Sequence, residues 1–169
     1  MKLVPIALVV LTLAPAAAVR ADDTRVTAVL ANPERYTDFR SSCVARPADA
    51  RALAGEIEAF LRTEAAPLLP EDTRLEITVV NVDMAGDIES WRGPGRCDLR
   101  VMKDVYPPRI ELRFRLTDAD GRETRAGRRL LQDSNYLADA ESGGLDRLRH
   151  EKALLRDWLR RELREGTGS

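Results

Sequence analysis

The segment Arg109–Leu116 constrains the fold more than any other part of the chain, because its apolar residues alternate strictly with charged ones. This alternation is typical of a β-strand with one buried face and one wet face. The apolar members are Ile110, Leu112, Phe114 and Leu116, and the charged members are Arg109, Glu111, Arg113 and Arg115. A turn-forming run at 117–121 ends in glycine, and residues 123–132 follow as the partner strand. The two segments predict an antiparallel hairpin.

Two more strands and a helix are predicted before this hairpin. Residues 25–30 and 75–82 are apolar and rich in β-branched side chains, which favours strands. Between them, apolar residues recur at helical spacing from Pro47 until Pro67 stops the pattern. A helical crossover makes the two strands candidate parallel neighbours. Residues 31–45 are predicted to be irregular and pinned to the core by their aromatic side chains.

A second helix is predicted from Leu145 onward, with the single histidine, His150, on its polar side. Its apolar arc consists of Leu148, Leu155, Trp158, Leu159 and Leu163. The tail 166–169 is expected to fray. Together these elements predict one α+β domain over residues 22–169, with an antiparallel or mixed sheet and two helices packed on one face.

Residues 1–21 have the pattern of a secretory signal peptide. Lys2 supplies the positive start, and an apolar run too short to span a bilayer is followed by small residues. Cleavage after Ala18 or after Ala21 fits the small-x-small rule, and we favour Ala21 because two aspartates then begin the mature chain. We therefore expect a periplasmic or secreted protein that does not span a membrane once processed.

Charge argues against a dedicated nucleic-acid binder. The chain has 27 Lys and Arg against 28 Asp and Glu, and removal of Lys2 and Arg20 with the signal changes the net charge from −1 to −3. Phosphate backbones demand a strong basic excess. The length is sufficient for one domain with a substantial core.

The two cysteines, Cys43 and Cys97, are candidates for a disulfide in an oxidising compartment. Cys43 precedes the first predicted helix, and Cys97 follows the strand that returns beside it, so both should lie at the same end of the domain. The alternative is a pair of unpaired buried thiols. We favour the disulfide.

The long connection 84–106 is the best candidate for a binding site, since connections of this length are usually functional or disordered. Trp91 and Tyr106 argue against disorder. Trp91 either anchors a partner or covers the core as a lid, and the lid is favoured. Arg92 and Arg96 belong to the same predicted binding set.

Acidic residues are concentrated in and beside this connection. The candidate cluster is Asp83, Asp87, Asp98 and Asp104, with Glu89 beside it. Two such carboxylates could serve as acid and base or hold a hard cation. The favoured explanation is structural: the first two cap turns or accept amide hydrogens, and the others pair with Arg96, Arg100 or Lys103. One histidine and two distant cysteines support neither a His-based nucleophile nor zinc, so we assign no catalytic residue, metal or cofactor.

Arginines form a second candidate surface on the predicted hairpin. Arg113 and Arg115 share the wet side of one strand with Arg109, and more arginines follow in the partner strand. These are Arg122, Arg125, Arg128 and Arg129. Such a face could bind an anionic ligand through bidentate contacts. A solvated face, partly neutralised by Glu111 and Glu123, is the favoured alternative.

Four runs of the sequence resemble a known family. They are DMAGDIESWRGPG, DLRVMKDVYPPRIELRFRLTDADG, LQDSNYL and EKALLRDWLRREL. In this order they resemble the bacterial exported family called domain of unknown function 3016. The resemblance implies a small exported protein, mainly of proteobacteria, with no established activity, cofactor or catalytic residues. The cysteines are not part of that family's pattern.

The favoured function is that of an exported, non-enzymatic binding or accessory protein of the cell envelope that acts through the loop 84–106. Its partner would be an envelope protein or an anionic envelope ligand. The alternatives are a hydrolase or metal-dependent enzyme that uses the loop carboxylates, and a purely structural role. If the protein is an enzyme, we expect a pocket where two carboxylates meet with a shifted pKa. If it is a binding protein, we expect exposed apolar side chains near Trp91.

Overall fold

The computed structural model describes residues 25–89, 91, 97, 99–138 and 146–164. Several sequence predictions therefore lie outside the described residues. These are the signal peptide 1–21, Arg92, Arg96, Asp98, Leu145 and the tail 166–169.

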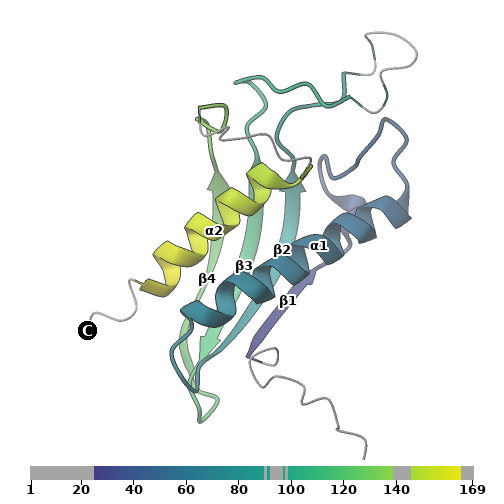
Figure 1. The fold of residues 1–169 in the computed structure, drawn as a ribbon. Coiled ribbons are helices and arrows are strands. Elements are labelled where there is room, and N and C mark those ends of the chain that lie inside the picture. Colours follow the sequence, from purple (N-terminus) through teal and green to yellow (C-terminus); the bar gives the residue numbers. More distant parts are fainter. Residues whose placement is uncertain (1–24, 90, 92–96, 98, 139–145, 165–169) are drawn as a thin grey trace, which may run out of the picture.

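The strands form one four-stranded mixed sheet in the order β1-β2-β3-β4 (Figure 1). Their bounds are Val26–Leu30 for β1, Arg74–Asp83 for β2, Arg109–Thr117 for β3 and Glu123–Gln132 for β4. β1 runs parallel to β2, and the other neighbours are antiparallel. The predicted parallel pair and the predicted hairpin are both confirmed. Gly121 closes the hairpin with φ of 77°, the left-handed conformation that glycine adopts most easily.

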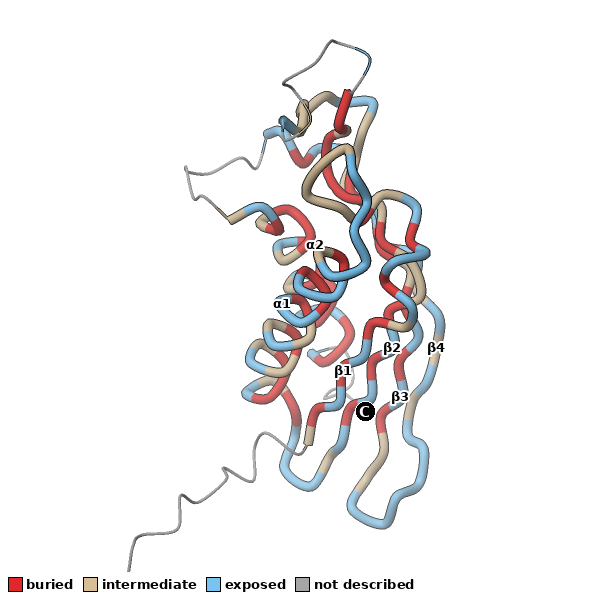
Figure 2. Tube along the Cα trace, turned by 90° about the vertical axis from the view of Figure 1, so that its right-hand side faces the viewer, coloured by how far each residue is buried: buried red, intermediate tan, exposed pale blue. Residues whose placement is uncertain are grey.

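Two α-helices cover one face of this sheet, α1 at Pro47–Ala65 and α2 at Arg149–Arg164. Short 3₁₀ turns lie at Pro33–Arg35 (η2) and Ala66–Leu68 (η3). Viewed from the side, helices and strands form two layers, with the loops gathered at one end (Figure 2). The predicted α+β domain with two helices on one face is confirmed. α2 begins at Arg149, later than the sequence pattern predicted.

The core lies between these layers. The inward side chains of β3 are nearly inaccessible to solvent, as are those of β2 opposite them. The Trp158 indole of α2 is 3% exposed and packs edge-on against Phe114, with ring centroids 5.7 Å apart. Tyr36 and Phe39 are buried beside the sheet, as predicted for the segment that precedes α1.

The predicted solvent-facing position of His150 is wrong. Its side chain is 8% exposed and meets the Tyr136 ring edge-on at a centroid distance of 5.0 Å. The turn after β4 carries Tyr136 over this side of α2. Periodicity within α2 alone could not reveal that cover.

Two arginines of β4 also depart from the prediction of a single wet arginine face. Register pairs Arg125 with Leu116 and Arg129 with Leu112, which places both on the helix side of the sheet. Both guanidinium groups bond Glu162 of α2, and the Trp158 indole N–H donates to the same carboxylate at 3.3 Å. β4 is an edge strand beneath α2, so these arginines join the two layers by charge where apolar side chains would otherwise meet.

We expect Trp158→Ala to lower the free energy of unfolding by about 3–5 kcal/mol, because it removes a buried ring and leaves a cavity. Urea denaturation measures the change. Trp91→Ala is the matched control, since that ring is 67% exposed and its loss should change stability by less than about 0.5 kcal/mol. Equal effects of the two substitutions would contradict the assigned core.

Candidate functional site

The loop 84–106 is anchored at its base by backbone hydrogen bonds. Asp87 and Val101 exchange N–H···O bonds of 3.0 and 2.8 Å, and the Gly86 N–H donates to the Tyr106 carbonyl at 3.0 Å. We call residues 88–100 the excursion. The hydrogen-bonded residues at its base, Gly86, Asp87, Val101 and Tyr106, form its neck. Asp87 and Val101 form an isolated antiparallel bridge outside the named strands.

Gly86 is required at this neck. Its φ is 74°, and a Cβ there would lie 2.8 Å from both the Val101 carbonyl oxygen and the Met102 sulfur. Any side chain would push the two sides of the neck apart.

Buried polar side chains hold the loop onto the domain. Glu89 is 2% exposed and forms an ion pair with Lys103. The Tyr136 hydroxyl donates to the Lys103 carbonyl at 2.6 Å and accepts its N–H at 3.0 Å. The described partner of the Lys103 ammonium group is therefore Glu89, and the predicted partner Asp98 lies outside the described residues.

Arg100 joins the loop to the segment before α1. Its guanidinium donates to Asp38 at 2.6 Å and to the Gly86 carbonyl at 2.9 Å. It also donates to the Arg40 carbonyl at 3.0 Å, so one side chain ties the loop to the segment before α1. Asp38 lies in the stretch predicted to be irregular, and nothing in its sequence pattern marked it as a partner.

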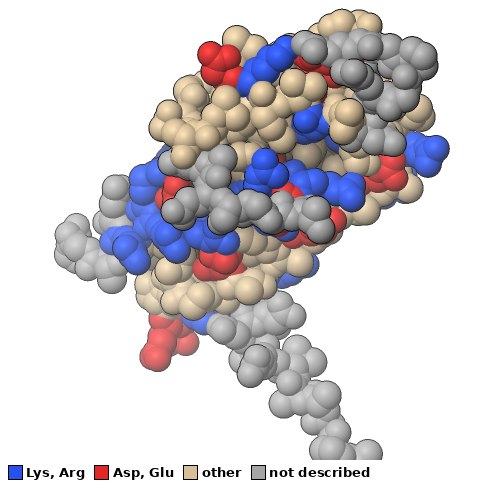
Figure 3. All heavy atoms as spheres, turned by 45° about the horizontal axis from the view of Figure 1, so that its top comes forward, with Lys and Arg blue, Asp and Glu red and all other residues tan. Residues whose placement is uncertain are grey.

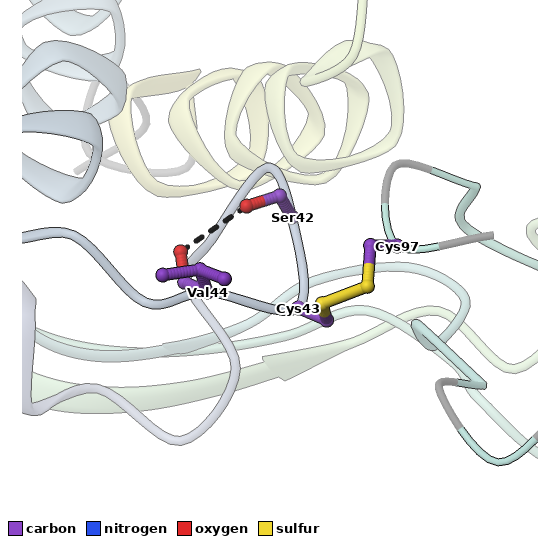
Figure 4. Close-up of a disulfide and its surroundings, with 4 residues drawn as sticks. All are labelled: Ser42, Cys43, Val44 and Cys97. Atoms are coloured by element: carbon purple, nitrogen blue, oxygen red, sulfur yellow. Dashed lines mark hydrogen bonds between the residues drawn. A yellow bond between two sulfur atoms is a disulfide. The ribbon is translucent and has the colours of Figure 1, made fainter. Parts of the chain in front are cut away.

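The predicted disulfide is confirmed (Figure 4). Cys43 and Cys97 are joined with their Cα atoms 4.8 Å apart, across 54 positions of sequence. The Cys43 N–H also donates to the Cys97 carbonyl at 2.8 Å, and Ser42 Oγ donates to the Val44 carbonyl at 3.1 Å. The excursion is therefore fixed at its far side as well as at its neck.

An acidic pocket of about 280 Å³ opens beside the neck. Asp38, Asp83 and Asp87 line it, together with Tyr106 and Arg109. Asp38 and Asp83 lie side by side because their backbones form a parallel bridge. The structure thus brings two of the four predicted acidic residues together with the predicted Tyr106.

Burial raises the pKa of the Asp83 carboxyl, and the negative charge of Asp38 raises it further, while Arg109 and Arg100 oppose the shift. Within the described residues, neither Asp83 nor Asp87 accepts a hydrogen bond from a loop amide, so the predicted turn-capping role is wrong. Asp104 is exposed on the turn that follows Lys103.

Trp91 does not cover the core. Its side chain is 67% exposed, and two other apolar side chains of the loop, Leu99 and Val105, are 58% and 67% exposed. The predicted lid is wrong because Ile88 and Ala85, both 2% exposed, already fill the space below the neck.

The remaining predicted binding residues, Arg113 and Arg115, lie on the open face of the sheet. Arg115 makes a two-pronged ion pair with Glu76 of β2, with N···O distances of 2.8 and 3.0 Å. Arg128 pairs with Glu111 across β3 and β4. This face is therefore largely neutralised between strands, and it does not contribute to the loop end.

No group of three or more His, Cys, Asp or Glu side chains is arranged to hold a metal ion in the part of the chain that the structure describes. Over the same residues, no helix combines the length and apolarity needed to cross a bilayer.

Comparison with known proteins identifies the family. Residues 24–161 match the family described as "Protein of unknown function (DUF3016)". The chain belongs to the DUF3016 family. Neither a curated protein nor a solved structure matches it. The motif-based resemblance is thereby confirmed, and the DUF3016 match covers the sheet, α1, the loop and most of α2.

This DUF3016 domain contains one more buried acid that sequence reasoning missed. Glu151 of α2 is fully buried, and its Oε1 accepts the Ala85 N–H at 2.8 Å, directly below the loop neck. Burial raises the pKa of this carboxyl, while the Ala85 N–H and Arg100 act in the opposite direction. A signal was present in the sequence, because Glu151 falls on the apolar arc between Leu148 and Leu155.

We expect Glu151 to make stability depend on pH. Its folded-state pKa lies above the unfolded value of about 4.3, so its stabilising contribution is complete below that pH and is lost as pH rises through the folded pKa. Glu151→Gln should remove this component. Urea denaturation from pH 4 to pH 8 should show wild type losing stability relative to the variant as pH rises, whereas the exposed control Asp104→Asn should show no such trend. A difference between wild type and Glu151→Gln that is constant with pH would contradict the assignment.

Proposed function

We propose that the protein is an exported, non-enzymatic binding protein of the bacterial cell envelope, and that it binds an envelope protein through the loop 84–106. The observation that carries this proposal is the exposure of Trp91 on an excursion whose neck and far side are both fixed. A large aromatic ring exposed to water is the kind of residue that anchors protein interfaces.

Leu99 and Val105 extend the apolar surface of the same loop. The neck hydrogen bonds and the disulfide at Cys97 restrain the chain on both sides of Trp91, which reduces the entropy lost when a partner binds. The binding role therefore rests on both the chemistry of the exposed side chains and the rigidity of their support.

Export is supported by two features. Residues 1–21 have the pattern of a signal peptide. The disulfide between Cys43 and Cys97 is of the kind that persists in oxidising compartments such as the periplasm.

Capture from a periplasmic extract tests the proposal. The full chain with a C-terminal tag is expressed in a Gram-negative host and recovered by osmotic shock, and bound proteins are identified by mass spectrometry. We expect Trp91→Ala to reduce capture of the partner about tenfold or more, as for an interface hot spot. Leu130→Ala is the matched control, because Leu130 is 72% exposed on the edge strand β4, outside the loop 84–106, and its loss should leave capture unchanged.

Two outcomes would contradict this proposal. Absence of the chain from the osmotic-shock fraction would contradict export. Equal capture by wild type and Trp91→Ala would contradict the role of the excursion.

A carboxylate-based hydrolase is the second candidate, and the acidic pocket is the specific observation that favours it. Asp83 has a raised pKa suited to a proton donor, and its neighbour Asp38 is held by Arg100 and Arg40 at 2.6 and 3.0 Å. Two carboxylates in such different environments can serve as acid and base. No metal is needed for this chemistry.

If this second candidate holds, purified protein should hydrolyse a member of a nitrophenyl ester and glycoside panel. Asp83→Asn should then reduce kcat at least about a hundredfold, the usual cost of removing a general acid. Asp104→Asn, which removes an exposed carboxylate of the same loop, should leave turnover unchanged. Absence of turnover by wild type would remove this candidate.

A further inference from the structure

A second and larger cleft lies on the other side of the loop neck. Its volume is about 840 Å³, within the range of small-molecule sites. Its walls come from three separate parts of the chain: the segment 40–46 before α1, residues 97–102 of the loop, and the start of α2. The disulfide between Cys43 and Cys97 forms part of the wall.

The charge of this cleft differs from that of the whole chain. Acidic residues slightly outnumber basic ones in the sequence, yet the described lining contains five arginines and one acid, Asp49. The arginines are Arg40, Arg46, Arg100, Arg147 and Arg149. Figure 3, which brings the loop end forward, shows Lys and Arg side chains in a band across the middle of the molecule.

Three of these arginines are available to a ligand. Arg100 and Arg40 are paired with Asp38. Across the residues that the structure describes, no carboxylate lies within salt-bridge distance of the other three, which are Arg46, Arg147 and Arg149. They come from two segments about 100 residues apart, so the fold rather than a local run of charge brings them to one cleft.

Both long helices begin at this cleft. Arg46 is the N-cap of α1 and makes no side-chain capping bond, and α2 begins at Arg149 (Figure 1). The amide groups of a first helical turn and the positive end of the helix dipole favour an anion. At α2 the Asp146 carboxylate already accepts the Leu148 N–H at 2.9 Å, so the guanidinium groups and the start of α1 supply the attraction for an anion.

We propose that this basic cleft binds a phosphate-ester anion through Arg46, Arg147 and Arg149. The planar guanidinium fork matches two phosphate oxygens at once. Val44, Met102 and the disulfide give the cleft an apolar side, which suits an ester with a small apolar body over a bare inorganic ion. The inference goes beyond the proposed function, because it adds a second ligand at the loop end that is separate from the protein interface at Trp91.

Calorimetric titration at low salt tests this assignment, with glycerol 3-phosphate and inorganic pyrophosphate as soluble probes. Co-sedimentation with phosphatidylcholine vesicles, with and without phosphatidylglycerol, tests the same group on a lipid. Binding of glycerol 3-phosphate in preference to pyrophosphate assigns a free phosphate ester, and binding only to the anionic vesicles assigns a lipid headgroup. Both outcomes support the proposal, and absence of both overturns it.

The double variant Arg46→Gln, Arg149→Gln should weaken binding of the active probe at least about tenfold, because it removes two charge-assisted contacts. The matched control is Arg74→Gln, Arg113→Gln, which removes the same charge from the open face of the sheet and should change Kd less than about twofold. If both double variants lose affinity for the probe equally, net charge alone accounts for the loss and the proposed site is overturned.

The phosphate site and the proposed protein interface can fail separately. Trp91→Ala should retain full affinity for the phosphate probe, since Trp91 is not among the residues that line the cleft. Loss of partner capture with unchanged probe binding therefore reports on the interface alone. Loss of probe binding in the Arg46 and Arg149 variant, with the partner still captured, reports on the cleft alone.

Discussion

The inward side chains of β2 and β3 pack against α1 and α2, and the arrangement of the loop end depends on this one apolar contact. Strict alternation in β3 leaves no choice of face, because a shift of one residue would place charged side chains in the core. Once both helices lie on that face, their first turns and the chain crossing from β2 to β3 all emerge at the same end of the sheet. The candidate sites are a consequence of this topology.

Polar rather than apolar contacts then hold the loop end in place. Glu151 bonds the backbone of Ala85, Tyr136 bonds both backbone groups of Lys103, and Arg100 reaches Asp38. Each of these groups is largely removed from water, and a buried polar group that loses its partner is costly. These bonds fix the base of the loop to the domain, on both sides of the part that carries the exposed Trp91.

Sequence patterns predicted the fold well because β3 and the two helices obey simple periodicities. The failures all concern contacts between elements that are distant in sequence. Nothing local to α2 indicates that Tyr136 covers His150, and nothing in β4 indicates that Glu162 turns Arg125 and Arg129 inward. At the site, the sequence placed Asp83, Asp87 and Tyr106 in or beside the long connection. It could not place their partner Asp38, because a backbone bridge to Asp83, 45 positions away in sequence, brings Asp38 there. The basic cleft was beyond prediction because it needs both helix starts and the disulfide at once.

The acidic pocket and the basic cleft are not independent, because they share a wall. Arg40 and Met84 line both, and Arg100 lines the cleft while its guanidinium bonds Asp38 in the pocket. Arg100 lowers the pKa of Asp83 against the effect of burial. An anion in the cleft that drew Arg100 away from Asp38 would weaken that effect and favour the protonated form of Asp83. By linkage, protonation of Asp83 would in turn favour the anion, so the two sites are coupled through Arg100.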